Sequence, residues 1–175
     1  MKTQAQSNTK MTKLCNLIED MSVAMLTSFD ADGTLASRPM APLEMDADGV
    51  LWFFTDLRSA KTQDLRNLGL SFSDSERAIY VSLSGHGEIN TARARIESMW
   101  TPLARPWFPD GPHSAHLGLL KFIPEAAEYW DAPHSGMVRM FALAGSVLAG
   151  KPIAMGDHDK LLHLAQPAAP ASARV

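Results

Sequence analysis

Cysteine is almost missing from this chain: Cys15 is the only one in 175 residues. A single thiol cannot form a disulfide within the chain, so the class of small disulfide-stabilised secreted folds is excluded. Cys15 also stands in a segment with helical spacing, where it suits a small apolar position on a helix. The sequence therefore favours a reducing compartment, and we expect a cytoplasmic protein.

An excess of positive charge is absent as well. The chain has 16 Lys and Arg residues against 19 Asp and Glu residues, for a net charge of -3. Such a chain has no positive field to attract polyanions, so we expect neither nucleic acid nor a membrane surface as a partner. A few basic side chains can still bind one small ligand that carries a phosphate group.

Long apolar runs are missing too. No stretch approaches the roughly 18 apolar residues of a membrane span, and the polar N-terminus lacks the apolar core of a signal peptide. We expect a flexible N-terminus over residues 1–10 and a single domain over residues 11–164. The Ala-, Pro- and Ser-rich residues 165–175 are expected to form a disordered tail.

Short strand patterns separated by turns make up most of the chain. Helical spacing is confined to residues 11–21, 59–67, 91–100 and 137–148, and regular βαβ alternation is absent. The sequence therefore predicts a mainly β protein with peripheral helices, a closed or partly closed antiparallel barrel of six or seven strands. The predicted strands are residues 23–28, 35–43, 50–55, 70–73, 78–89, 117–130 and 158–164.

Glycine and proline mark the turns and irregularities of this barrel. Gly33 and Gly49 end two predicted turns, and the Asp32-Gly33 step supplies the positive φ that the first hairpin needs. Gly85 and Gly87 interrupt the strand pattern of residues 78–89, which predicts a bulge or a close approach by another backbone or a ligand. Pro124 predicts a bulge or an edge in the strand of residues 117–130.

Several side chains suited to a phosphate group are expected at one end of two neighbouring strands. If residues 35–43 and 50–55 pair through the turn at residues 46–49, Arg38 lies near the end of the second strand. Thr55, Ser59 and Lys61 emerge at that end. A guanidinium group, an ammonium group and two hydroxyls together suit a dianionic phosphate, although each basic residue alone could be a solvated surface charge.

Aromatic side chains stand beside these polar residues. The strand Trp52-Phe53-Phe54 supplies apolar surface for a flat ring, and it could equally be part of the core. Met40 can add polarizable surface to the same wall. The combination suits a ligand with both a phosphate group and a planar ring.

The order of these motifs resembles a known family. Arg38-Pro39-Met40, the strand ending at Thr55 with Ser59 and Lys61 after it, and the Gly-x-Gly at residues 85–87 resemble general stress protein 26. The aromatic and proline-rich residues 100–111 and the segment 127–131 extend this resemblance over about residues 11–163. General stress protein 26 is a branch of the pyridoxamine 5′-phosphate oxidase-like family of FMN-binding split β-barrels. The resemblance implies a split β-barrel and a homodimer with FMN at the subunit interface.

The same resemblance assigns roles to individual residues. It places Arg38 and Lys61 on the FMN phosphate, with Ser59 and Thr55 as hydroxyl donors. Trp107 would cover the flavin from the partner subunit, unless it only packs at the interface. The isoalloxazine ring and the ribityl chain would be lined by Pro39, Met40, Phe53 and Phe54.

The resemblance leaves more than one function open. The first is a flavin-dependent oxidoreductase with an unknown small-molecule redox partner, and the second is a flavin carrier or sensor without turnover. Pyridoxamine 5′-phosphate oxidase activity is disfavoured, because the Arg-Leu-His-x-Arg element of those enzymes does not follow Tyr129-Trp130-Asp131. We predict no metal site, since no carboxylate or cysteine set completes His113 and His116.

Overall fold

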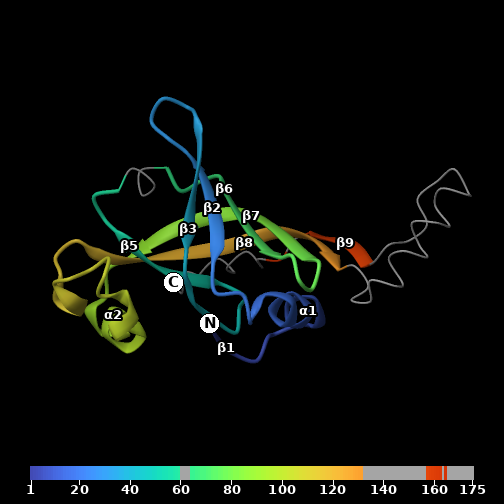
Figure 1. Ribbon diagram of the computed structural model, residues 1–175, viewed down its shortest axis with the longest axis horizontal. Coiled ribbons are helices and arrows are strands. Elements are labelled where there is room, and N and C mark those ends of the chain that lie inside the picture. Colours follow the sequence, from blue (N-terminus) through green and yellow to red (C-terminus); the bar gives the residue numbers. More distant parts are fainter. Residues whose placement is uncertain (60–63, 132–156, 163, 165–175) are drawn as a thin grey trace, which may run out of the picture.

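The chain folds around one curled β-sheet whose strands are mostly antiparallel (Figure 1). The computed structural model describes residues 1–59, 64–131, 157–162 and 164. Its described helices are α1 (Thr9–Ile18) and α2 (Arg93–Met99), and the 3₁₀ turns η2 (Pro102–Ala104) and η3 (Gly111–His113) follow α2. The strands are β1 (Lys2–Thr3), β2 (Ala24–Phe29), β3 (Leu35–Met40), β4 (Pro42–Met45), β5 (Leu51–Asp56), β6 (Leu68–Asp74), β7 (Ile79–Asn90), β8 (Leu117–Asp131) and β9 (Asp157–Leu162).

The sheet curls because β3 and β4, which lie toward opposite ends of the strand order, follow each other directly in the chain. The strands are hydrogen bonded in the order β1-β4-β5-β8-β7-β6-β2-β3, with β9 beside β8. β3 ends this path on one side, and β4 lies at the other side with only β1 beyond it. Yet Ala41 alone separates β3 from β4 in the chain. The result is an open half-barrel, which confirms the predicted mainly β, split-barrel class.

Over the residues that the structure describes, the sheet has nine strands in place of the predicted six or seven. The run of residues 35–43 is divided at Ala41 into β3 and β4, which pair with different neighbours. Residues 1–10 hold β1, parallel to β4, and the start of α1, where the sequence predicts a flexible N-terminus. Local polarity cannot reveal this pairing with a distant strand. Residues 64–67 are not helical, while the predicted helix 137–148 and the predicted tail 165–175 lie outside the described residues.

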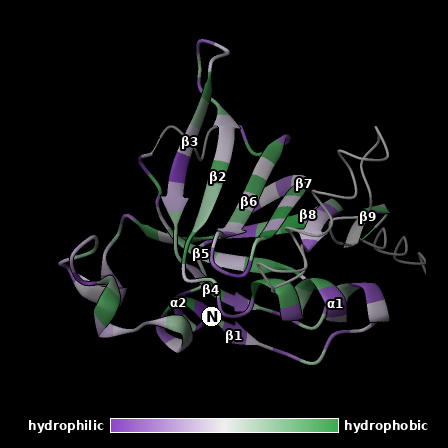
Figure 2. Ribbon diagram, turned by 45° about the vertical axis from the view of Figure 1, so that its right-hand side comes forward, coloured by the Kyte–Doolittle hydropathy of each residue, from purple (hydrophilic) through white to green (hydrophobic). Residues whose placement is uncertain are grey.

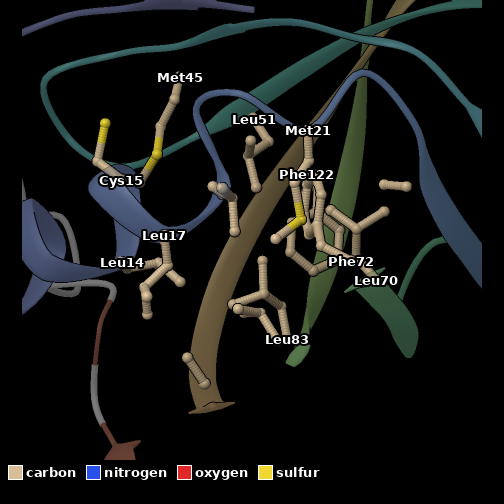
Figure 3. Close-up of a cluster of buried hydrophobic side chains, with 14 of the residues drawn as sticks. Leu14, Cys15, Leu17, Met21, Met45, Leu51, Leu70, Phe72, Leu83 and Phe122 are labelled. Atoms are coloured by element: carbon tan, nitrogen blue, oxygen red, sulfur yellow. The ribbon is translucent and has the colours of Figure 1, made fainter. Parts of the chain in front are cut away.

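The inner face of the curled sheet holds the main hydrophobic core. Alternate residues of β2, β6 and the first half of β7 are buried on this face, and Figure 2 shows the alternation as bands of different colour along β6 and β7. α1 packs on this core and is capped by Asn8, whose side chain accepts a hydrogen bond from the Met11 amide at 2.9 Å. Burial raises the pKa of the Cys15 thiol on α1, in keeping with its apolar surroundings. Figure 3 shows side chains of this core, including Leu14, Leu17, Met21, Met45, Leu51, Leu70, Phe72, Leu83 and Phe122.

A second, smaller cluster lies on the outer face of β5 and β8, where α2 covers it. It joins Trp52 of β5 to Ile96 and Met99 of α2 and to Leu117 and Leu119 of β8. β5 is therefore covered on both faces. Among the residues that the structure describes, no helix is long and apolar enough to cross a membrane.

The predicted turns and bulge are confirmed by the backbone. Gly33 and Gly49 have φ values of 81° and 80°, in the left-handed region that favours glycine. The β7–β8 register shifts between Ser84 and Gly85, where Gly85 pairs with Pro124. A Cβ atom on Gly85 would lie 2.1 Å from the Ile123 carbonyl oxygen, so this close approach of two strands requires glycine.

Candidate functional site

Arg38 lies on the inner face of β3, near the hairpin that joins β2 to β3. It pairs with Leu26 of β2, and Ser28 and Asp30 follow Leu26 on the same side at two-residue spacing. Arg38 Nη1 donates to Ser28 Oγ at 3.1 Å, and Arg38 Nη2 donates to Asp30 Oδ1 at 2.6 Å. The guanidinium group is thus held in one place at the rim of the barrel, with 29% of the side chain exposed.

Thr55 lies on the inner face of β5, near the end of the strand. It pairs with Gly118 of β8 and is completely buried. Its Oγ1 atom has no hydrogen-bond partner among the described residues. An unpaired buried hydroxyl costs about 1–3 kcal/mol, so this group is a candidate for contact with a ligand.

β3 and β5 part from each other where these side chains lie. β4 pairs with β5 as far as Pro42 and Phe53. Beyond that pair, in the part of the chain that the structure describes, β3 is hydrogen bonded only to β2 and the end of β5 only to β8. Figure 1 shows β3 running toward the hairpin at the top while β5 runs to the left. We call the region where the two strands diverge, with Arg38 and Met40 on one strand and Thr55 on the other, the split.

Phe53 and Phe54 point to opposite faces of β5. Phe53 is completely buried in the inner core. Phe54 lies on the outer face, where its ring centroid is 5.6 Å from that of Trp100 and 6.0 Å from that of Phe108. The structure therefore does not bring the two predicted ring-lining residues to one surface.

The loop that Phe54 supports carries two of the most exposed apolar side chains. Leu103 is 82% exposed and Trp107 is 75% exposed. Pro39 is also exposed, on the outer face of β3 opposite Met25. Trp107 and Pro39 thus do not point into the inner core, and their exposed side chains can contact a second chain.

The segment after β5 begins with a tight turn. The Ser59 amide donates to the Asp56 carbonyl at 3.0 Å, which places Ser59 directly after the split. The Arg58 side chain donates to both oxygens of Asp56 at 3.0 and 2.7 Å, and this contact holds the pKa of the Asp56 carboxyl well below its usual range. Lys61 lies outside the described residues, so its convergence with Arg38 stays a prediction.

Ser28 and Asp30 are two residues at this site that the sequence analysis missed. Their signal was their two-residue spacing on the strand that pairs with Arg38 across the predicted hairpin.

A separate hollow of about 280 Å³ lies where β6 begins, with His86 Nδ1 2.7 Å from Glu125 Oε1. It is lined by Leu65, Arg66, His86, Gly87 and Glu125, none of which belongs to the predicted site.

Known proteins resemble this chain in sequence and in fold. Residues 9–153 match the pyridoxamine 5′-phosphate oxidase like family. Protein bli-3 of Neurospora crassa is 27% identical over 163 residues, which cover 86% of this chain and 78% of that protein.

Among solved structures, a general stress protein 26 from Jannaschia sp. CCS1 superposes with a TM-score of 0.67 at 26% identity, over 87% of this chain and 98% of that one. A general stress FMN/FAD binding protein from Xanthomonas citri superposes with a TM-score of 0.59 at 26% identity, over 71% of this chain and 89% of that one.

Proposed function

This chain belongs to the pyridoxamine 5′-phosphate oxidase-like family, and we propose on that basis that it binds FMN at the split between β3 and β5. The observation that carries the proposal is the pair of donors on the inner face there. Arg38 presents a fixed guanidinium group, and Thr55 presents a buried hydroxyl without a partner among the described residues. An anionic oxygen-rich ligand satisfies both groups.

The other predicted residues divide between the ligand and its surroundings. Arg38 and Lys61 bind the phosphate group, with Ser59 and Thr55 as hydroxyl donors. Met40 contacts the ring system from the inner face of β3, Pro39 lies on the outer face, where a second chain would meet it, and Phe53 belongs to the core beneath the inner face. Phe54 does not contact the ligand itself. Its ring contacts with Trp100 and Phe108 support the loop that carries Trp107.

A homodimer would complete the site. The outward positions of β2, β3, β6 and β7 up to the bulge are exposed or half-buried and carry no charged side chain, although 20% of the chain is charged. A surface of this kind suits contact with a second copy, and Trp107 from that copy would cover the flavin. These outward positions are Met25, Thr27, Phe29, Leu35, Ser37, Pro39, Gly69, Ser71, Ser73, Tyr80, Ser82 and Ser84.

Bound FMN would supply electron transfer, and the protein would bind the ring, orient it and limit the access of water. The function proposed is a flavin-dependent oxidoreductase with a small-molecule substrate. The Xanthomonas citri protein, described as FMN/FAD binding, supports the flavin. The second candidate is a flavin carrier or sensor, favoured by the fact that Arg38, Met40 and Thr55, the described residues that define the split, include no general acid or base.

The absorption spectrum of the purified protein is the first test, followed by titration with FMN and with riboflavin. We expect Arg38→Ala to weaken FMN binding by about 1–3 kcal/mol and to leave riboflavin binding nearly unchanged, since riboflavin lacks the phosphate group. Arg66→Ala is the matched control, because Arg66 also pairs with an aspartate, Asp64, at 2.8 Å but lies outside the split. Equal weakening of both ligands by Arg38→Ala would refute the phosphate assignment.

A turnover assay distinguishes an oxidoreductase from a flavin carrier or sensor. Reduction of the bound flavin by NADH or NADPH, followed by its reoxidation with a small acceptor over many cycles, would support the oxidoreductase. A flavin that binds but is not reduced by either donor would support the carrier or sensor.

A further inference from the structure

We infer that Asp30 is a positioning residue, which holds the Arg38 guanidinium in the orientation that receives the phosphate group of the ligand. This inference rests on the proposed function, since it assumes that Arg38 binds phosphate. It adds a residue that stands eight positions from Arg38 in the chain and does not itself touch the ligand.

The position of Asp30 is fixed by the hairpin in which it stands. Its amide donates to the Thr34 carbonyl at 2.8 Å, and its carbonyl accepts from the Gly33 amide at 2.9 Å. The backbone of Asp30 is therefore held on both sides of the turn between β2 and β3. A carboxylate whose backbone is fixed in this way can restrain the side chain that it contacts.

Arg38 is held at both of its terminal nitrogens. Asp30 Oδ1 accepts from Nη2 at 2.6 Å, and the buried Ser28 Oγ accepts from Nη1 at 3.1 Å. A long arginine side chain otherwise samples many rotamers, and binding a ligand would have to order it. With both ends fixed in advance, less rotamer freedom is lost when the phosphate group binds.

The guanidinium group keeps donors for the ligand. It carries more N–H groups than the two contacts use, and no other described residue accepts from Arg38. The negative charge of Asp30 opposes a phosphate group, but the two side chains are 29% and 32% exposed, so water and salt screen this repulsion. The gain from orientation is therefore expected to exceed the loss from repulsion.

The test compares Asp30→Ala with Asp30→Asn by titration with FMN and riboflavin. Asp30→Ala removes the acceptor, and we expect it to raise the dissociation constant of FMN by roughly 5- to 30-fold with riboflavin binding unchanged. Asp30→Asn keeps an oxygen acceptor at the same place and should recover most of the loss. Asp32→Ala is the matched control: Asp32 stands in the same turn and accepts from the Thr34 amide at 3.0 Å without contacting Arg38.

The double variant Arg38→Ala/Asp30→Ala should bind FMN no more weakly than Arg38→Ala alone, because Asp30 acts through Arg38. FMN binding that is unchanged or tighter in Asp30→Ala would overturn the inference, as would an equal loss of FMN and riboflavin. If Arg38→Ala weakens FMN binding while Asp30→Ala does not, only the role of Asp30 fails. If Arg38→Ala leaves FMN binding intact, the proposed phosphate site fails and this inference fails with it.

Discussion

Side chains alternate between the two faces of β5, and the two faces have different surroundings. Leu51, Phe53 and Thr55 point inward and are completely buried, and Leu51 and Phe53 belong to the core cluster that also holds side chains of α1. Trp52 and Phe54 point outward, where α2 and the loop after it bury Trp52 and leave Phe54 half-buried. The inner face is buried and ends in a hydroxyl that has no hydrogen-bond partner among the described residues. The outer face instead supports a loop whose own exposed side carries Trp107, so one strand can serve both the ligand and a second chain.

The largest expected effect is the loss of stability on replacing Phe53, which should exceed the loss on replacing its neighbour Phe54. Phe53→Ala should lower the free energy of unfolding by about 3–5 kcal/mol, because it leaves a cavity in an enclosed core. Phe54→Ala should cost less, about 1–2 kcal/mol, since Phe54 is half-buried and the loop can settle around the smaller side chain. Denaturant unfolding of both variants without flavin measures the difference. Equal losses would mean that the outer cluster is as closely packed as the core.

Thr55→Val tests the role of the polar group at the end of the inner face of β5. Valine keeps the shape and removes the unpaired hydroxyl, so the free energy of unfolding without flavin should stay constant or rise by about 1 kcal/mol. FMN binding should weaken by about 1 kcal/mol, measured by titration. Thr27→Val is the control, because the Thr27 hydroxyl is 2.7 Å from the Ser37 hydroxyl, and its loss should destabilise by about 1 kcal/mol. A clear loss of stability in flavin-free Thr55→Val would show that the hydroxyl already has a partner.

Trp107→Ala examines the exposed side of the outer loop. Trp107 makes little contact within its own chain, so the unfolding free energy of the flavin-free monomer should change by less than about 0.5 kcal/mol. The stabilisation by added FMN should fall, because in the proposed dimer the partner's tryptophan would no longer cover the ring. Trp100→Ala offers the contrast, since Trp100 contacts Phe54 and its loss should lower stability directly. An unchanged shift of the melting temperature by FMN would remove Trp107 from the site.

Much of this fold could be predicted from periodicity, and the site only in part. Two-residue alternation and the turns at Gly33 and Gly49 located the strands of the sheet, because these signals are local. The division of residues 35–43 at Ala41 depends on which distant strands pair with each half, so no local pattern shows it. The ion pair of Asp30 with Arg38 was hidden for a related reason: it depends on the register across the hairpin, which fixes the side-chain faces.

The smallest expected effect lies at the rim, away from both faces of β5. The Asp74 carboxylate accepts from the Arg77 amide at 2.9 Å and from Arg77 Nε at 2.6 Å, and these contacts hold the pKa of Asp74 below its usual value. The stabilisation is complete above the pKa of the unfolded chain and is lost as the pH falls through the lower pKa of the folded state. Asp74→Asn should therefore melt slightly below the parent protein, by a difference that is constant above about pH 5 and shrinks below about pH 4. A difference that widens on acidification would mean that protonation of Asp74 favours the fold, and the turn would then owe its stability to something other than this carboxylate.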